Sequence, residues 1–166
     1  MNMTISQEIR IRDVEERDLQ EVKSILELSF EGWYLWAGLR GLERSDKVLV
    51  AESDGSVAGV VELRFVEAGE RVGIVYYLAT HPTHRAKGVA SALLEASLQL
   101  FIEKGAKTAL CSIEQENLPS QEFFKKYIFI ETSALSLAAK YKVHFFSILR
   151  RATIVPGEVI FTKPLV

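Results

Sequence analysis

The order of apolar and polar residues predicts a strand and two helical stretches in the first third of the chain. Residues 9–12 (IRIR) alternate like a short strand. Residues 19–30 place Leu, Val, Ile and Phe side chains at helical spacing, and Asp18 stands where a capping residue would begin that helix. Residues 32–41 (GWYLWAGLRG) are aromatic and bracketed by glycines, which fits a loop or a short helix.

A two-residue period follows and predicts an antiparallel meander. Residues 47–52 (KVLVAE) and 57–65 (VAGVVELRF) flank the turn sequence SDGS, in which Asp54-Gly55 is a hairpin signal. Within the second run, apolar residues alternate with Glu62 and Arg64, so we expect one face of this strand to be wet. The sequence EAGE then turns the chain into residues 71–80 (RVGIVYYLAT), a third strand.

The second half of the chain returns to helical spacing. Residues 88–103 carry an apolar stripe, Gly105 ends that helix, and residues 107–113 (KTALCSI) form a strand. Strand, helix and strand in this order indicate a parallel crossover. Asn117 and Pro119 mark a further helix start. Residues 129–133, 141–150 and 158–163 are predicted to be closing strands, and residues 134–141 (ALSLAAKY) fit either a helix or a connection.

These elements predict a mixed α+β fold whose sheet is mostly antiparallel with one central parallel β-α-β crossover. The chain of 166 residues suffices for a single domain over residues 1–166. A net charge of −2 argues against general nucleic-acid binding, and the single Cys111 excludes an internal disulfide. The N-terminal sequence MNMTISQEIRIRD has no apolar signal core, and no apolar run approaches the length of a membrane span. We therefore expect a cytoplasmic protein without a membrane partner.

The stretch THPTHRAKGVASALLEASLQLF (residues 80–101) is the strongest chemical signal. A glycine stands where the helix begins, beside Arg85 and Lys87. A helix N-terminus offers unpaired N–H groups and a partial positive charge, which suit a phosphate. Gly88 lets an anion approach the backbone, and Arg85 supplies charge-assisted hydrogen bonds. The run lacks the glycines of a P-loop or a dinucleotide fingerprint.

The sequence here resembles the GNAT N-acetyltransferase superfamily. Residues 76–95 (YYLATHPTHRAKGVASALLE) look like that family's acetyl-CoA segment, with Arg85, Gly88 and Ala90 in the Arg-x-x-Gly-x-Gly/Ala positions. Residues 117–129 (NLPSQEFFKKYIF) resemble its second segment, with Asn117, Ser120 and Phe129 in place, and residues 9–19 resemble its opening. The element order matches over nearly the whole chain, including the expected helices on both faces of the sheet.

The resemblance implies that acetyl-CoA is the cosubstrate and a primary amine the acceptor. Near Leu78, Ala79 and Thr80 the third strand would splay from residues 109–113. The pantetheine arm would lie in that gap, where it would pair with the Leu78 and Thr80 backbone, and a backbone N–H would polarise the acetyl carbonyl. The backbone N–H groups of the following segment would hold the pyrophosphate, and Asn117 would reach the arm. The cofactor-binding set also includes Ser120 and the whole helix start, namely Arg85, Ala86, Lys87, Gly88, Val89, Ala90 and Ser91.

The catalytic positions of the family pattern are altered in this chain. The tyrosine that often serves as general acid is replaced by Phe124, so Tyr127, three residues on, becomes the candidate acid. A glutamate base on the strand before Asn117 is replaced by Ser112, and the usual glycine before the final Phe is Ile128. Glu62, Glu114 and Glu116 are the remaining candidate bases.

These departures leave two functions open. The first is transfer of an acetyl group directly to the amine of a small molecule, a protein N-terminus or a lysine. The second is a CoA-binding module without turnover that acts as a sensor or interaction protein. Without a strong base, an amine of low pKa or a water relay is favoured, because a lysine of pKa about 10.4 costs roughly 4.6 kcal/mol to deprotonate at pH 7 and an α-amino group near 7.7 only about 1 kcal/mol.

Several other residues have structural interpretations. His81 and His84 form a pair without a third ligand at metal-site spacing, so we expect solvated loop histidines and no metal. His144 fits a strand, and Cys111 a buried apolar position. The aromatic residues Trp33, Tyr34 and Trp36 fit the core, a dimer contact or the lining of an acceptor pocket. A homodimer through the C-terminal strands is a further possibility, and the acceptor and the acyl-chain preference have no signature in the sequence.

Overall fold

The computed structural model describes residues 7–166. The sequence analysis expected no signal peptide in the N-terminal segment, and the first six residues of that segment lie outside the described range. The strands are β1 (Arg10–Asp13), β2 (Lys47–Ser53), β3 (Ser56–Glu67), β4 (Arg71–Thr80), β5 (Thr108–Glu114), β6 (Ile130–Thr132) and β7 (Glu158–Pro164). The α-helices are α1 (Leu19–Ser29), α2 (Gly32–Arg44), α3 (Val89–Glu103), α4 (Leu118–Lys126), α5 (Ala134–Tyr141) and α6 (Phe145–Ala152). Short 3₁₀ turns cover Glu16–Asp18, Pro82–His84 and Lys142–His144.

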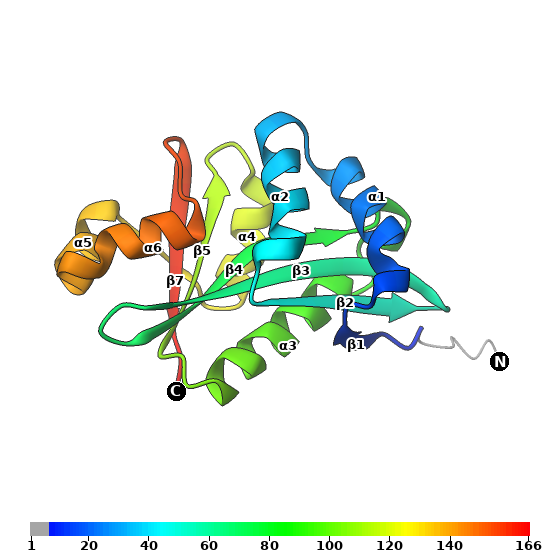
Figure 1. Ribbon diagram of the computed structural model, residues 1–166, viewed down its shortest axis with the longest axis horizontal. Helices are drawn as coiled ribbons and strands as arrows, with labels where there is room; N and C mark the ends of the chain where they lie inside the picture. Colours follow the sequence, from blue (N-terminus) through cyan, green and yellow to red (C-terminus); the bar gives the residue numbers. More distant parts are fainter. Residues whose placement is uncertain (1–6) are drawn as a thin grey trace. The chain divides into compact units, whose positions relative to one another are not determined.

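The described strands form a seven-stranded sheet in the order β1-β2-β3-β4-β5-β7-β6 (Figure 1). β4 and β5 are parallel, with Val72 opposite Thr108 and Ile74 opposite Leu110, and helix α3 connects them in the sequence. β1–β2, β5–β7 and β6–β7 are antiparallel. The predicted mixed, mostly antiparallel sheet with one parallel crossover is therefore confirmed.

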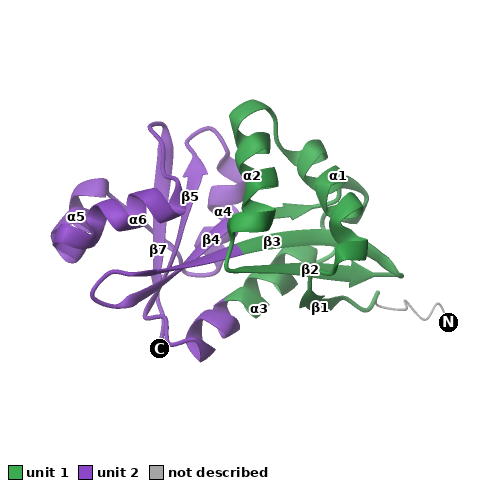
Figure 2. Ribbon diagram, in the orientation of Figure 1, with its two compact units in different colours: residues 1–62, 77–97 green, residues 63–76, 98–166 purple. Residues whose placement is uncertain are grey.

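The chain divides into two compact units (Figure 2). Unit 1 comprises residues 1–62 and 77–97, and unit 2 comprises residues 63–76 and 98–166. The single domain over residues 1–166 stays a prediction, and each unit is described by itself below. Among the described residues, none of the helices is both long enough and apolar enough to cross a bilayer.

In unit 1, residues 32–41, which the sequence analysis assigned to a loop or a short helix, belong to helix α2. Residues 32–44 are helical, so the loop interpretation of GWYLWAGLRG is wrong and the helix is longer than expected. Gly38, inside the helix, is a packing position, because a Cβ there would lie 2.9 Å from the ring of Tyr77. The Tyr77 hydroxyl donates a 2.6 Å hydrogen bond to the backbone carbonyl of Tyr34, and its ring meets Phe30 edge-on.

In unit 2, the connection between β6 and β7 is helical. Residues 134–141 form α5, whose Ser133 cap accepts a 3.0 Å hydrogen bond from the Ser136 N–H. The prediction of a strand over residues 141–150 is wrong, because the chain continues into a 3₁₀ turn, which contains His144, and then into α6. Ile148 and Ala152 are four residues apart and face the core, a helical spacing that the run of apolar residues concealed.

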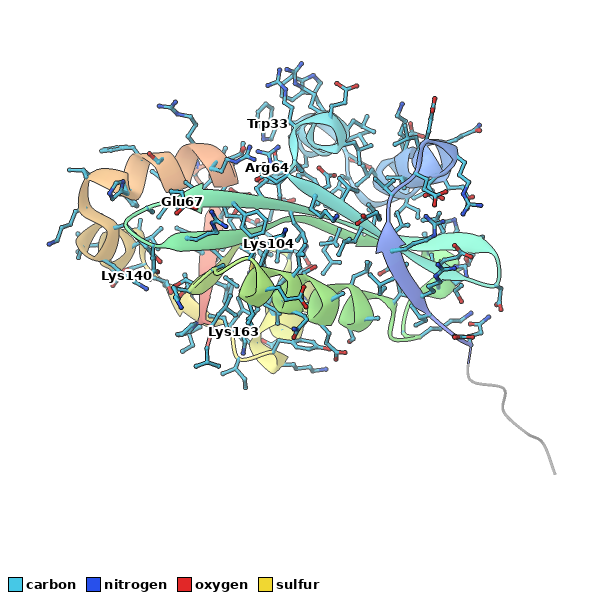
Figure 3. The ribbon with its side chains drawn as sticks, turned by 60° about the horizontal axis from the view of Figure 1, so that its bottom comes forward. Trp33, Arg64, Glu67, Lys104, Lys140 and Lys163 are labelled. Carbon is cyan, nitrogen blue, oxygen red and sulfur yellow. The ribbon has the colours of Figure 1, made fainter. Side chains whose placement is uncertain are left out.

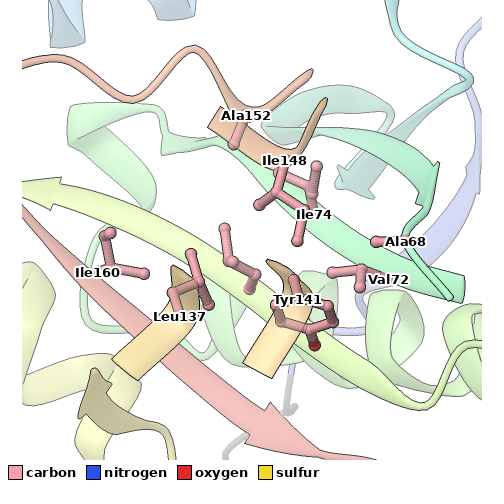
Figure 4. Packing of buried hydrophobic residues seen from close by; sticks show 9 residues of the cluster. Ala68, Val72, Ile74, Leu137, Tyr141, Ile148, Ala152 and Ile160 are labelled. Carbon is pink, nitrogen blue, oxygen red and sulfur yellow. The ribbon is translucent and has the colours of Figure 1, made fainter. Parts of the chain in front are cut away.

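The core of unit 2 shows why these helices form. Leu137 and Tyr141 of α5 and Ile148 and Ala152 of α6 pack on strand residues (Figure 4). The strand residues of this cluster are Val72 and Ile74 of β4, Leu110 of β5 and Ile160 of β7, joined by Ala68. Burial of such side chains contributes about 1.5–3 kcal/mol each, which offsets the cost of ordering the two short helices.

The expected wet face of β3 is not present, because Glu62 and Arg64 are both buried. In unit 2, the Arg64 guanidinium lies 3.5 Å over the ring of Tyr76 and donates to the carbonyl of Arg151 at the end of α6. In unit 1, Glu62 is completely buried. Strand alternation shows which side chains share a face, whereas burial depends on whether a helix covers that face.

Candidate functional site

The end of β4, in unit 1, has a defined backbone orientation. The N–H of His81 donates a 2.8 Å hydrogen bond to the carbonyl of Ala58 in β3. The carbonyl oxygen of Ala79 also faces β3, where it would lie 3.0 Å from a Cβ placed on Gly59. Because backbone polar groups alternate along a strand, those of Leu78 and Thr80 point to the opposite edge. These are the two residues predicted to pair with the pantetheine arm.

The turn that follows β4 carries the predicted anion site. Arg85 and Lys87 are exposed, and the backbone is left-handed at Ala86 (φ 59°) and at Gly88 (φ 85°). A Cβ on Gly88 would meet nothing within 4 Å, so this position requires glycine for its backbone angle and borders open space. The approach of an anion to Gly88, which the sequence predicts, stays a prediction.

Helix α3 begins directly after this turn. At the N-terminal end of α3, the Ala92 N–H donates a 3.0 Å hydrogen bond to the Gly88 carbonyl. The N–H groups of Val89, Ala90 and Ser91 stand before that bond, where a helix has no internal acceptors for them. Together with the helix dipole, they form a positively polarised end that favours an anion.

Close packing fixes this helix end against β3. A Cβ on Gly59 would lie 2.7 Å from Cγ1 of Val89 and 3.0 Å from Cδ1 of Leu93. Val89 and Leu93 are buried, whereas the residues of the preceding turn are exposed. Sequence reasoning missed Gly59, although a glycine inside a strand pattern signals that another backbone or side chain approaches closely.

The remaining predicted residues lie in unit 2. Asn117 is the N-cap of α4, and its side-chain oxygen accepts a 3.3 Å hydrogen bond from the Ser120 N–H. The helix is also tied to the end of β5 by Gln121, whose side-chain amide donates to the carbonyls of Glu114 and Gln115 at 3.1 and 3.0 Å. Gln121 is a buried polar residue that the sequence analysis did not single out.

Tyr127, the candidate acid, follows the last residue of α4. Its half-buried ring lies against Phe123, and its backbone carbonyl accepts a 2.8 Å hydrogen bond from Lys163 (labelled in Figure 3). Phe124, at the usual acid position, is buried against Phe129. Ile128, where the family pattern has glycine, has a left-handed backbone with φ 63°. The role of Tyr127 stays a prediction.

The candidate bases differ in environment. Glu62 is buried in unit 1, whereas in unit 2 Glu114 is half-buried at the end of β5 and Glu116 is exposed. Ser112, at the position of the family glutamate, is half-buried in β5. The assignment of these three glutamates as candidate bases stays a prediction.

Two charged clusters away from these residues have a structural role. In unit 1, Arg12 donates to both oxygens of Asp18 at 2.7 and 2.9 Å, which lowers the pKa of Asp18 to about 2. In unit 2, burial alone would raise the pKa of Glu70, but hydrogen bonds from Tyr141 and Thr108 hold it below its usual value. Cys111 is buried, which confirms its interpretation as an apolar position, and this burial raises the pKa of its thiol.

The loop histidines and the aromatic residues of α2 occupy different surroundings. His81 and His84 both contact the Thr83 hydroxyl, at 2.8 and 3.0 Å. Within the described part of the chain, no cluster of three His, Cys, Asp or Glu side chains suits a metal. Trp33 (labelled in Figure 3) and Trp36 are about half exposed and stack at 5.1 Å, so they lie at the surface of unit 1, whereas Tyr34 is half-buried.

The predicted cofactor-binding and catalytic residues thus form two groups, one in each unit. The strand end at Leu78–Thr80, the basic turn and the start of α3 are contiguous in unit 1. Asn117, Ser120 and Tyr127 all lie on or directly beside α4 in unit 2. In unit 1 the strand end leads directly into the basic turn and the start of α3, where the predicted anion site lies.

Comparison with known proteins agrees with this geometry. A curated relative, a mycothiol acetyltransferase of Clavibacter sepedonicus, is 33% identical over 82 residues, which are 49% of this chain and 26% of the relative. The chain thus matches only about a quarter of the length of that protein.

Solved structures show the same fold at low identity. A putative GNAT acetyltransferase from Desulfovibrio desulfuricans superimposes with a TM-score of 0.72 at 17% identity, covering 96% of this chain and 100% of the other. A chain of the NatC complex bound to Gag peptide and CoA gives a TM-score of 0.71 at 15% identity, covering 96% and 99%.

The sequence model of the acetyltransferase (GNAT) family matches residues 9–128, a segment that runs from β1 to the end of α4 and contains the strand edge, the basic turn and the capped helix. The resemblance seen in residues 76–95 and 117–129 is confirmed by this match. The chain therefore belongs to the GNAT acetyltransferase family.

Proposed function

We propose that this protein transfers an acetyl group from acetyl-CoA to a primary amine. The observation that carries the proposal is the helix end in unit 1, where a left-handed glycine at φ 85° and two exposed basic residues precede N–H groups at the start of α3. A pyrophosphate carries negative charge and several acceptor oxygens, which such an end is suited to bind. Family membership supports acetyl transfer.

The strand edge supports a second part of the cofactor site. Leu78 and Thr80 direct their backbone polar groups away from β3. The parallel pairing of β4 with β5 covers Val72–Ile74, which precede these two residues in the strand. An extended ligand with amide groups, such as pantetheine, pairs with an edge of this kind as another strand would. The CoA in the crystal structure of the NatC complex supports the same cosubstrate here.

The reaction follows from these contacts. The amine nitrogen attacks the thioester carbonyl, and a backbone N–H at the end of β4 stabilises the negative charge on the oxygen of the tetrahedral intermediate. The C–S bond then breaks, so that the thiolate leaves and takes up a proton while the nitrogen loses one. Tyr127 is the proposed acid for the leaving thiolate, and Glu62, Glu114 and Glu116 are the candidate bases.

We propose an acceptor amine of low pKa, such as an α-amino group. Direct attack needs a neutral amine, and at pH 7 deprotonating a lysine costs roughly 4.6 kcal/mol, against about 1 kcal/mol for an α-amino group. Ser112 stands where some family members carry a glutamate base, so this chain has no carboxylate at that position to deprotonate the more costly amine. A pH–rate profile that shows an essential base with a lysine-like substrate would contradict this preference.

The test is isothermal titration of acetyl-CoA into the protein and into Gly88→Trp. The matched control is Gly105→Trp, because Gly105 terminates the same helix with φ 79° and a Cβ there also meets nothing within 4 Å. Both variants carry similar backbone strain, but only Gly88→Trp obstructs the pyrophosphate position. We expect affinity to fall by about tenfold or more in Gly88→Trp and to change little in the control. Absence of binding to the unmodified protein would refute the cofactor assignment.

A CoA-binding module without turnover is the second candidate. It is favoured by the loss of both usual proton carriers, since Phe124 is buried among aromatic rings and Ser112 replaces a carboxylate. Release of free thiol from acetyl-CoA, measured against a panel of peptides, polyamines and amino sugars, separates the two. Binding without thiol release above the hydrolysis background would favour the module.

A further inference from the structure

The connection between β6 and β7 presents a surface whose composition differs from the rest of the chain. From residue 133 to residue 157 there is no Asp or Glu, but there are two lysines and two arginines. The chain as a whole carries a net charge of −2, so this tract concentrates positive charge in an otherwise acidic protein. It also lies beyond residues 9–128, the segment that the family model matches.

Large apolar side chains protrude from the same tract. Leu135 and Val143 are each 82% exposed and Phe146 is 71% exposed. In the continuous turn and helix over residues 142–152, Val143, Phe146 and Arg150 are three and seven residues apart, so they share one stripe. The opposite stripe contains Ile148 and Ala152, which pack in the core of unit 2. The outward stripe of this amphipathic element is thus apolar and basic.

The basic residues flank the apolar ones. Lys142 and Arg150 are exposed, and Lys140 (labelled in Figure 3) is 55% exposed with an ion pair to Glu70 at 3.4 Å. Arg151 points its guanidinium back to the Phe65 carbonyl and belongs to the interior of unit 2. The outward charge therefore comes from Lys142 and Arg150, with a partly neutralised contribution from Lys140.

We propose that this α5–α6 surface, formed by Leu135, Lys142, Val143, Phe146 and Arg150, binds the surface of an anionic lipid membrane. Protruding aliphatic and aromatic side chains beside lysine and arginine match the boundary between acyl chains and negative headgroups. Hydrocarbon accepts Leu, Val and Phe side chains without a matching groove. A symmetric dimer through this surface would bring two basic patches together, which charge opposes. The earlier expectation of no membrane partner rested on the absence of a spanning segment, which a surface-bound protein does not need.

The test is flotation of the full chain with vesicles of phosphatidylcholine alone or with about one third phosphatidylglycerol. We expect binding to the anionic vesicles, weakened by salt, and at least about tenfold less binding for Leu135→Ser/Val143→Ser/Phe146→Ser and for Lys142→Glu/Arg150→Glu. The matched control is Leu28→Ser/Lys23→Glu, which removes a 57% exposed leucine and an exposed lysine from α1 and should bind as the unmodified protein does. Circular dichroism melting establishes that each variant is folded.

Three outcomes would overturn the proposal. They are equal flotation with neutral and anionic vesicles, equal loss of binding in the control, and a dimer in sedimentation velocity that the α5–α6 variants abolish. The last would assign the surface to a second copy of the chain. Since no arm of the test uses acetyl-CoA, its failure is distinguishable from failure of the proposed acetyltransferase function.

Discussion

The contact between β3 and the start of α3 gives the sharpest quantitative prediction. A methyl group added in Gly59→Ala would lie 2.7 Å from Cγ1 of Val89 and 3.0 Å from both the Ala79 carbonyl oxygen and Cδ1 of Leu93. Overpacking of this kind costs about 1–3 kcal/mol. Replacing a strand glycine by alanine returns about 0.5–1 kcal/mol of backbone entropy. We therefore expect Gly59→Ala to lower the free energy of unfolding by roughly 0.5–2 kcal/mol.

A double-mutant cycle with Val89→Ala isolates the clash. Val89→Ala removes two buried methyl groups and should cost about 1.5 kcal/mol by itself. In the double variant the new methyl group at residue 59 occupies the space that Cγ1 leaves, so the combined loss should fall short of the sum by about 1 kcal/mol. Urea unfolding of the four proteins at one temperature measures this coupling.

The same cycle links packing to the proposed cofactor site. Val89 is the first residue of α3, so a shift forced by Gly59→Ala displaces the N–H groups that we propose bind the pyrophosphate. Acetyl-CoA affinity should fall in Gly59→Ala and recover in the double variant. Additive free energies within about 0.5 kcal/mol, or a Gly59→Ala protein more stable than the original, would refute the packing argument.

Three further predictions concern local features. Ile128 is 66% exposed and has φ 63°, a conformation that costs an L-residue about 1–2 kcal/mol. After the entropy cost of glycine is deducted, Ile128→Gly should raise the free energy of unfolding by roughly 0.5–1 kcal/mol. A lower melting temperature of the variant would contradict this. The pKa of Asp18 is lowered to about 2, so its contribution of about 2 kcal/mol is complete above the unfolded-state pKa near 4 and is lost as the pH falls toward 2. Urea unfolding of Asp18→Asn should therefore lack this part of the acid dependence, and an unchanged slope between pH 4 and 2 would exclude Asp18 as its source. Asn117→Ser keeps a capping oxygen for the Ser120 N–H but removes the side-chain amide, so the free energy of unfolding should change by only a few tenths of a kcal/mol. If Asn117 also holds the pantetheine arm, the affinity for acetyl-CoA, measured by titration, should fall.

Most of the fold was readable from the sequence because the turns between its elements carry strong signals. The Asp54-Gly55 turn, with both residues at positive φ, matches the hairpin signal, and Gly105 ends α3 with φ 79° as expected. Gly88 is a further local feature of this kind, since the turn before α3 needs a left-handed backbone there, whereas the anion site itself stays a prediction. Local chemistry decides these features, and local chemistry is visible in a sequence.

The features that the sequence analysis misassigned depend on which other elements pack against a segment. The run VHFFSIL contains adjacent apolar residues that satisfy a strand as well as a helix, and only the packing of Ile148 and Ala152 on the sheet of unit 2 selects the helix. Glu62 and Arg64 fit a solvated strand face until burial is known. Gly38 and Gly59 were not singled out in the sequence, although each makes room for a particular side chain. The roles of Tyr127 and Asn117 stay predictions, because no sequence pattern places them against a substrate.

The strand order also constrains how the chain reaches its native state. β7 pairs along its whole length with β5, from Thr108 opposite Pro164 to Glu114 opposite Glu158, and with β6 on its other side. During synthesis, β5 and β6 therefore emerge before the strand that separates them, and each has an unpaired edge until residues 158–164 leave the ribosome. An early pairing of β5 with β6 would occupy the place of β7 and trap the nascent chain. Contacts between residues some 50 positions apart form slowly, so release of β7 sets the moment at which unit 2 can fold.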